Sequence, residues 1–319
     1  MNRINRFAES FFQRLPLHIS SKERLKALFW RSTSCAKQGM DRKARLLSHI
    51  SPTEQDGLEI GPLSYPTVTK DESNSRIRYV DFATAEMLRE KYRDDPNVCV
   101  GDIVETDYLW GKSSLPELVN GQQFDYVIAS HVIEHVPDML GWMREIADVL
   151  KDNGILSLAI PDKRYTFDVL RELTSPGTLV EAYLLKKRRP GPREIFDHVS
   201  LAAKVDAKAA WRKRLDKRKL EHHGTIVTAL EHAQANLSTE DYCDVHVNIF
   251  TSASFIDLLE TASRLGLFDF LIEDFFDTAF DTVEFLVSLK RLPRNEGQEQ
   301  RLEKQISSLT WARNQLLKA

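Results

Sequence analysis

Three short apolar segments, each followed at once by glycine or a polar residue, constrain this chain more than any other feature. The first is Asp56-Gly-Leu-Glu-Ile-Gly61, and the second, which ends in Tyr79-Val-Asp81, follows about twenty residues later. The third is Phe124-Asp-Tyr-Val-Ile-Ala-Ser-His131. Buried strands that stop at such residues are typical of an open α/β sheet whose ligand site lies at the strand ends.

Short apolar strands alternate with helices along the middle of the chain. We predict strands at 57–61, 76–81, 97–102, 124–130 and 154–160, and helices at about 83–93 and 138–150. The pattern resumes with the N-cap sequence Thr251-Ser-Ala-Ser254, a helix, and strands at about 267–275 and 283–290. This alternation implies parallel strands joined by right-handed crossovers.

The order of these segments resembles the class I S-adenosylmethionine-dependent methyltransferases. Asp56-Gly-Leu-Glu-Ile-Gly61 is similar to their first motif, Gly101-Asp-Ile103 to the adenine-facing element, and Leu150-Lys-Asp-Asn-Gly-Ile-Leu-Ser-Leu158 to the turn into their fifth strand. The resemblance covers about 57–162 by motif and 251–290 by layout. It implies a Rossmann-like seven-stranded sheet, mostly parallel with the last strand antiparallel, and a helical insertion between strands five and six.

Four regions follow from this resemblance and from composition. We expect residues 1–50 to form a basic helical N-terminal arm, and residues 51–161 with 251–292 to form the methyltransferase domain. We expect residues 162–250 to form a helical insertion that caps the site, and residues 293–319 to form a C-terminal helix.

The resemblance also implies which residues bind the cofactor, S-adenosyl-L-methionine. Glu59 and Gly61 would lie beneath its methionine part, Asp81 would bind the ribose, and Asp102 would face the adenine amino group. The remaining residues expected at the cofactor lie beside these motifs: Pro62, Phe82, Ile103, Ser130 and His131.

The sequence departs from the family at Pro62, where a second glycine is usual. Proline fixes its own φ and has no amide donor, so either the loop takes a different workable shape or the chain is a cofactor-binding scaffold that has lost catalysis. We expect a working site because the strand-end acids are present. Gly-Pro-Leu-x-x-Pro and Pro161-Asp-Lys-Arg-Tyr-Thr-Phe-Asp168 are similar to a branch associated with bacterial surface-glycan biosynthesis.

Methyl transfer to a hydroxyl needs a base, and histidine titrates near neutrality. We expect His131, which follows the fourth strand, to be this base, assisted by His246 or Asp162. Capping or packing is the alternative role for each. The acceptor would contact Lys163, Arg164, Tyr165 and His198, unless these residues only start or cap helices.

Charge and composition indicate the partners. Residues 1–50 hold 11 Lys and Arg against 3 Asp and Glu, and residues 186–219 hold 13 against 4. These basic stretches are either solvated helix faces or contacts for an anionic acceptor or a membrane surface. Residues 1–30 would contact a membrane, their own domain, or a second copy in a homodimer.

The remaining composition favours a cytoplasmic protein, with membrane association as an option. Cys35, Cys99 and Cys243 lack metal-ligand spacing, so we expect neither disulfides nor a metal site. No apolar run is long enough to cross a bilayer. The basic stretches lack interleaved aromatic residues, and Ser130-His131-Val132 replaces an amino-methylating tetrad, so nucleic acid is not expected as a partner.

Two function hypotheses stay open. The first is O-methylation of a sugar or glycolipid precursor in cell-surface polysaccharide biosynthesis. The second is methylation of another small molecule, such as a quinone or a polyketide. The basic stretch at 186–219 favours the first, because enzymes of the second kind tend to have a more apolar lid.

Overall fold

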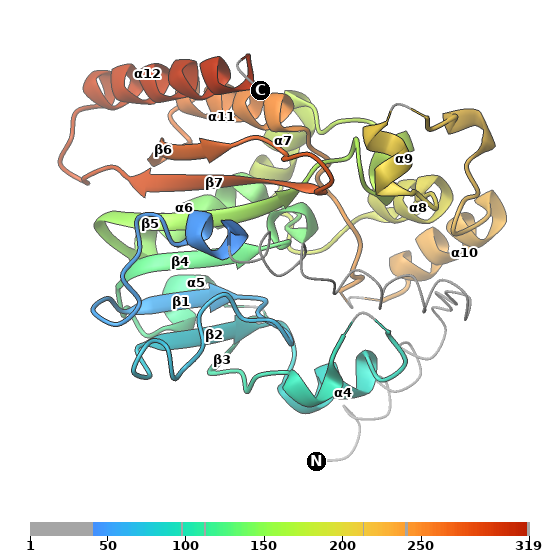
Figure 1. Ribbon diagram of the computed structural model, residues 1–319, viewed down its shortest axis with the longest axis horizontal. Coiled ribbons are helices and arrows are strands. Elements are labelled where there is room, and N and C mark those ends of the chain that lie inside the picture. The colour runs from blue at the N-terminus through green and yellow to red at the C-terminus, as the bar shows by residue number, and fades with distance from the viewer. Residues whose placement is uncertain (1–40, 97, 112, 213, 240–241, 318–319) are drawn as a thin grey trace.

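A single seven-stranded sheet organises the protein (Figure 1). The computed structural model describes residues 41–96, 98–111, 113–212, 214–239 and 242–317. The strands are β1 (Gly57–Ile60), β2 (Ile77–Asp81), β3 (Tyr108–Leu109), β4 (Phe124–Ser130), β5 (Leu150–Pro161), β6 (Phe270–Phe276) and β7 (Glu284–Arg291). Their spatial order is β3-β2-β1-β4-β5-β7-β6.

Among the strands that the structure describes, β7 alone runs opposite to the other six. β1 pairs in parallel with β2 and β4, β4 pairs in parallel with β5, and β7 pairs antiparallel with both β5 and β6. The carboxyl ends of β1, β2, β4 and β5 therefore meet at one edge of the sheet. This confirms the predicted fold class.

Helices cover the sheet and extend beyond that edge. They are α4 (Ala85–Lys91), α5 (Leu115–Leu118), α6 (Met139–Val149), α7 (Pro176–Leu184), α8 (Pro192–Leu201), α9 (Ala207–Trp211), α10 (Ile226–Leu237), α11 (Ser252–Arg264) and α12 (Gln298–Leu316). Single 3₁₀ turns are η2 (Val100–Asp102), η3 (Ile133–His135), η4 (Phe167–Leu170) and η5 (Lys217–Lys219). Figure 1 shows α8, α9 and α10 beside the carboxyl ends of the parallel strands.

The core forms because β4 is buried on both faces and α6 is amphipathic. Asp138 caps α6 by accepting a hydrogen bond of 2.8 Å from the Gly141 amide. Ile146 of α6 and Leu156 of β5 are fully buried in the same cluster. This packing fixes the end of β4, where the site begins.

The strand predicted at 97–102 is wrong where the structure describes it. Residues 100–102 form η2, and the third strand is the short β3 further along. Val98 and Val100 pack beside Leu88 of α4 and Ile103 instead of pairing with β2. Their apolar alternation therefore reflects contact with a helix.

The first and last helical segments that the structure describes pack on the sheet. Residues 41–46 are helical, and Leu46 is buried against Ala159 and Leu286. Gln305 of α12 donates hydrogen bonds to the carbonyls of Phe268 and Phe270, at 2.6 and 3.1 Å. The predicted membrane or subunit contact of residues 1–30 lies outside the described residues.

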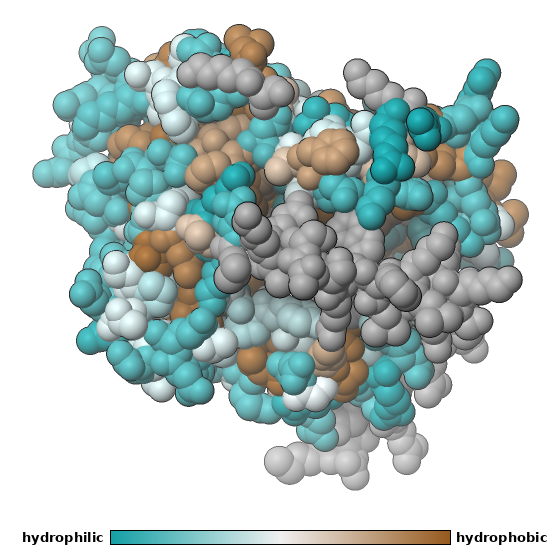
Figure 2. Space-filling model, viewed as in Figure 1, coloured by the Kyte–Doolittle hydropathy of each residue, from teal (hydrophilic) through white to brown (hydrophobic). Residues whose placement is uncertain are grey.

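No helix among the described residues is long and apolar enough to span a membrane. In the face shown in Figure 2, hydrophilic residues dominate and hydrophobic ones form separate patches.

Candidate active site

Gly61 closes β1 with a sharp turn. Its φ is +67°, a conformation that residues with side chains rarely adopt, and its amide donates to the Val80 carbonyl at 2.8 Å. A Cβ atom at this position would lie 3.1 Å from Cγ2 of Val132. The position therefore combines a required backbone shape with little free space, as a cofactor turn demands.

Glu59 stabilises the loop that follows this turn. Its buried carboxylate accepts hydrogen bonds from the amides of Thr67 and Val68, at 2.6 and 3.2 Å. Burial raises the pKa of Glu59 to about 7, although these hydrogen bonds act in the opposite direction. Pro62 is buried within the same loop. The loop thus has a defined support in place of the second glycine.

Asp81 ends β2 with a buried carboxylate. It is 6% exposed and accepts a 2.7 Å hydrogen bond from the amide of Phe82. Burial raises the pKa of Asp81 to about 6. Hydroxyl donors from a ribose would satisfy such a carboxylate, so the residues present fit an adenosine-containing cofactor.

The other predicted cofactor residues differ in exposure. Phe82 is 38% exposed and Asp102 is exposed, whereas Ile103 is buried. Oγ of Ser130 accepts a hydrogen bond from Arg42 at 2.7 Å. Their roles at the cofactor stay predictions.

His131 leaves β4 in a strained conformation. Its φ is +55°, and its amide donates to the Ala159 carbonyl at 2.9 Å. Nε2 lies 2.7 Å from the carboxylate of Glu284, which also pairs with Arg42. Burial opposes protonation, but the hydrogen bond to Glu284 and the charges of Glu134 and Glu284 raise the pKa of His131. Strain of this kind is common at functional sites.

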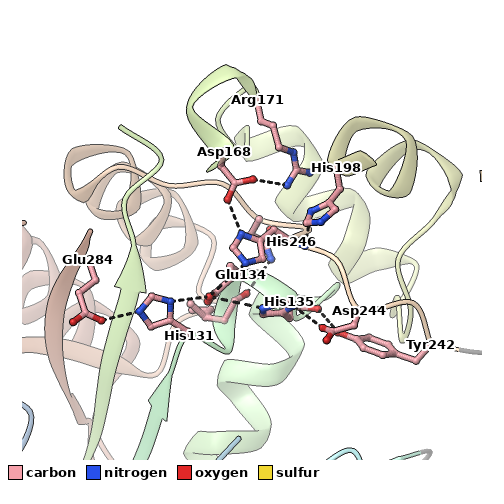
Figure 3. Close-up of polar contacts among 12 residues, drawn as sticks. His131, Glu134, His135, Asp168, Arg171, His198, Tyr242, Asp244, His246 and Glu284 are labelled. Carbon is pink, nitrogen blue, oxygen red and sulfur yellow. Dashed lines mark hydrogen bonds and ion pairs between the residues drawn. The ribbon is translucent and has the colours of Figure 1, made fainter. Parts of the chain in front are cut away.

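Three histidines surround Glu134 (Figure 3). Oε1 of Glu134 lies 3.6 Å from Nδ1 of His131 and 3.9 Å from Nε2 of both His135 and His246. Glu134 is fully buried, and His246 is buried above it.

A carboxylate lies behind each of two of these rings. Nδ1 of His135 is 2.9 Å from Asp244, and Nδ1 of His246 is 2.6 Å from Asp168. Arg171 donates to Asp168 at 2.9 Å. Burial opposes ionisation of Asp168, but His246 and Arg171 lower its pKa to about 2.

These side chains border a cavity of about 390 Å³. The cavity is lined by His131, Glu134, His135, Pro161, Tyr165, Thr166, Phe167, His246 and Val283. Strand ends and the insertion between β5 and α11 both contribute to it. It therefore provides an acceptor-sized space beside the end of β4.

Of the predicted acceptor residues, Tyr165 lines this cavity. Its ring stacks on Trp211, with centroids 3.9 Å apart. His198 does not line it. Nδ1 of His198 accepts a hydrogen bond from the amide of His246 at 3.2 Å, and burial lowers the pKa of His198 to about 3. His198 therefore holds the backbone of His246 as a neutral ring.

The roles predicted for Asp162, Lys163 and Arg164 need correction. Asp162 is fully buried, and its carboxylate accepts hydrogen bonds from Arg164 and from Oγ1 of Thr278 at 2.9 Å. It is therefore held by Arg164 and Thr278 and is not placed to assist His131. Nζ of Lys163 donates to the carbonyl of Arg171. Both cations are occupied within the fold, outside the cavity.

The basic run at 186–189 is also largely paired. Lys187 pairs with Glu194 at 3.3 Å, Arg188 pairs with Glu145 at 2.7 Å, and Arg189 donates to backbone carbonyls of residues 236 and 239. These contacts tie the run to α6 and, within the insertion, to α8 and α10. They do not favour the hypothesis that this run attracts an anionic acceptor.

Glu134, Glu284 and Asp168 were not among the site residues expected from the sequence. Glu134 was visible in the segment Ser130-His-Val-Ile-Glu-His135, where a glutamate and two histidines are close in sequence. No sequence signal identified Glu284 or Asp168, because each meets its histidine only through the tertiary fold.

The fold and the cofactor edge define an S-adenosylmethionine-dependent methyltransferase. The family model described as "Methyltransferase domain" matches residues 40–262, more than half of the chain, so the protein belongs to this family. No curated protein matches the sequence.

Solved structures with a similar chain path include other methyltransferases. "StiE O-MT residues 961-1257" is 11% identical with a TM-score of 0.40, over 90% of this chain and 87% of that one. The mitomycin 7-O-methyltransferase MmcR is 13% identical with a TM-score of 0.36, over 89% and 70%. The DszA carbon methyltransferase is 12% identical with a TM-score of 0.36, over 84% and 57%. These likenesses are too distant to bear on the acceptor.

Proposed function

We propose that this enzyme methylates a hydroxyl oxygen of a small polar acceptor, a sugar or glycolipid precursor of a cell-surface polysaccharide. The observation that carries the reaction type is the pair of His131 and Glu284 at the cavity. A histidine held by a carboxylate on one nitrogen, with its other nitrogen near a cavity, is arranged as a general base.

The cofactor side of the site belongs to β1 and β2. Gly61 would allow close approach of the cofactor, and Asp81 would accept hydrogen bonds from its ribose hydroxyls. When bound, S-adenosylmethionine would supply a methyl group on a positively charged sulfur. A nucleophile that attacks the methyl carbon releases S-adenosylhomocysteine. The chain itself must then bring the acceptor oxygen to this edge and remove its proton.

His131 is placed for the proton. If its Nε2–H donates to Glu284, its Nδ1 carries the lone pair and can accept the hydroxyl proton. Arg42 holds the carboxylate of Glu284 from the other side, at 3.0 Å through one of its terminal nitrogens. This arrangement fixes the ring and stabilises the imidazolium that forms.

The cavity indicates a compact acceptor. Its volume of about 390 Å³ is at the small end of the usual range for ligand sites, about 300–1,000 Å³. The lining is mostly apolar and includes the rings of Tyr165 and Phe167, while His131 and His135 contribute polar groups. A compact acceptor with an apolar ring face and a hydroxyl group suits this lining. We propose that the enzyme works in the cytoplasm, where residues 1–30 contact a membrane, their own domain or a second copy of the chain.

A labelled-methyl screen tests the proposal. The full chain is incubated with S-adenosylmethionine carrying an isotopic methyl group and with cell-envelope extract, and the labelled products are identified by mass spectrometry. We expect a methyl ether on a saccharide or lipid-linked saccharide. A labelled quinone, a labelled polyketide or a new carbon–methyl bond would contradict it.

A further inference from the structure

The carboxylate of Glu134 is buried without a hydrogen-bond partner. It is 0% exposed, and neither Oε1 nor Oε2 has such a partner among the described residues. The three ring nitrogens around Oε1, at 3.6 to 3.9 Å, lie beyond hydrogen-bonding distance. A buried anion left in this state is costly. Some positively charged group is therefore expected in the space between these atoms.

The surrounding atoms have the spacing of metal ligands. One atom from each of Glu134, His135 and His246 can be chosen so that all three lie within 4.8 Å of one another. Tetrahedral ligands with bonds of about 2.0–2.1 Å are about 3.4 Å apart. The two nitrogens lie 3.9 Å from Oε1 of Glu134, so the ligand atoms would have to move closer together to bind an ion.

His246 is oriented as metal-binding histidines usually are, because its Nδ1 contacts Asp168 at 2.6 Å and its Nε2 is turned toward Glu134. Nδ1 of His135 lies 2.9 Å from Asp244 without the geometry of a hydrogen bond, and its Nε2 lies 3.9 Å from Glu134. Such outer carboxylates fix the tautomer and raise the basicity of the ligating nitrogen.

The backbone holds the ligands in register. The carbonyl of Glu134 accepts hydrogen bonds from the amides of Val247 and Asn248, at 2.6 and 2.9 Å. The side chain of Asn248 donates to the carbonyls of Ile133 and Val136, at 3.3 and 2.7 Å. The segment with His246 is therefore tied directly to the 3₁₀ turn with Glu134 and His135. Such support is the requirement for a precise metal site.

We propose that Glu134, His135 and His246 bind a divalent cation of the zinc type. Two imidazoles and one carboxylate suit Zn²⁺ and its first-row neighbours. Three protein ligands leave a coordination position open, and all three residues line the cavity. In a role that rests on the proposed function, the ion would bind the acceptor oxygen and lower the pKa of its hydroxyl, with His131 beside it.

From the sequence alone we expected no metal site. Glu134 and His135 are adjacent, and the third ligand comes from the far end of the insertion, so no familiar spacing connects them. The Asp244-Val-His246 pair is also split in the fold, since Asp244 contacts His135 while His246 contacts Asp168.

Cobalt binding to the full chain tests this site without cofactor or acceptor. The protein is stripped with a chelator, titrated with Co²⁺ and followed by its visible absorption, and Zn²⁺ is then added as competitor. We expect one equivalent of Co²⁺ with a low-symmetry visible spectrum that Zn²⁺ abolishes. A folded wild-type chain that takes up no stoichiometric Co²⁺ or Zn²⁺ would overturn the proposal.

Variants locate the ion. Glu134→Gln and His246→Gln should each weaken Co²⁺ binding at least about 100-fold, and Asp168→Asn should weaken it about 10- to 100-fold. His232→Gln, on α10, should leave it unchanged. Circular dichroism checks that each variant is folded, and His246→Gln carries the test if Glu134→Gln is not. Unchanged binding in a folded ligand variant would place the ion elsewhere.

The readout separates this inference from the proposed function. Metal binding with no methyl transfer to any saccharide would leave the site standing and remove only the role given to it. Methyl transfer to a saccharide by a metal-free chain that takes up no Co²⁺ would support the proposed function and overturn the metal site.

Discussion

Nε2 of His131 lies 2.7 Å from the carboxylate of Glu284, although the two residues belong to strands that are not neighbours. His131 follows the end of β4, and Glu284 begins β7. Strand β5 lies between β4 and β7, and β7 runs antiparallel to it. The direction of β7 therefore places its first residue at the edge where the parallel strands end. A single reversed strand supplies the acid that orients the proposed base.

Replacing Glu284 by Gln should reduce turnover about 10- to 100-fold, because the neutral amide no longer stabilises a protonated His131. Affinity for S-adenosylhomocysteine, measured by calorimetry, should stay unchanged. Glu273→Gln is the control, since Glu273 is a carboxylate on β6 that contacts Lys290 instead. A matched loss of turnover in both variants would contradict a specific role for Glu284.

Asp81→Ala should weaken binding of S-adenosylhomocysteine by about one to two decades. Charge-assisted hydrogen bonds of about 1.5–3 kcal/mol from the ribose would be lost. Titration calorimetry measures this change, with Asp71→Ala as the control at an exposed aspartate. Equal affinities in wild type and Asp81→Ala would show that the ribose assignment is wrong.

The same residue should make stability depend on pH. Burial raises the pKa of Asp81 from 3.8 to about 6, so the folded state holds this proton more tightly than the unfolded state. The protonated carboxyl of Asp81 therefore stabilises the folded state fully below about pH 4, and this stabilisation is lost as pH rises through about 6. Relative to Asp81→Asn, the cofactor-free wild type should lose on the order of 1–3 kcal/mol of unfolding free energy across this window. Denaturation curves that give a constant difference between pH 4 and 7 would contradict the shift.

Gly61→Ala should lower the free energy of unfolding by about 1–2 kcal/mol, because alanine is strained at a φ of +67°. It should also weaken cofactor binding. Gly266→Ala provides a matched comparison, since its φ of +68° imposes similar strain at the end of α11, next to Gln298. Calorimetry should show normal cofactor affinity for Gly266→Ala, and a normal value for Gly61→Ala as well would remove Gly61 from the site.

Most strands of the sheet could be predicted from the sequence, because a buried strand is a local run of apolar residues that ends in a characteristic turn. The apolar run of β4 and the Glu-x-Gly end of β1 each depend on one strand and its immediate turn. The prediction of the third strand was wrong because Val98 and Val100 pack beside Leu88 of α4. Alternating apolar residues do not show whether they pack on a strand or on a helix.

The site was less predictable because its contacts join distant segments. His131 was found from its place after β4, but its partner Glu284 and the Asp168 behind His246 depend on the final packing. Asp162 was expected to assist His131 because it directly follows a strand. In the structure its buried carboxylate pairs with Arg164. Its position in the sequence suggested a catalytic role, whereas its contacts in the fold are structural.

His131→Ala tests the central claim most directly. Initial rates with the identified acceptor and calorimetry with S-adenosylhomocysteine are measured on the same preparations, with His232→Ala as the control. The account predicts that turnover falls by about two to four decades, as expected for loss of a positioned base, while cofactor affinity is retained. Near-normal turnover in folded His131→Ala would contradict it.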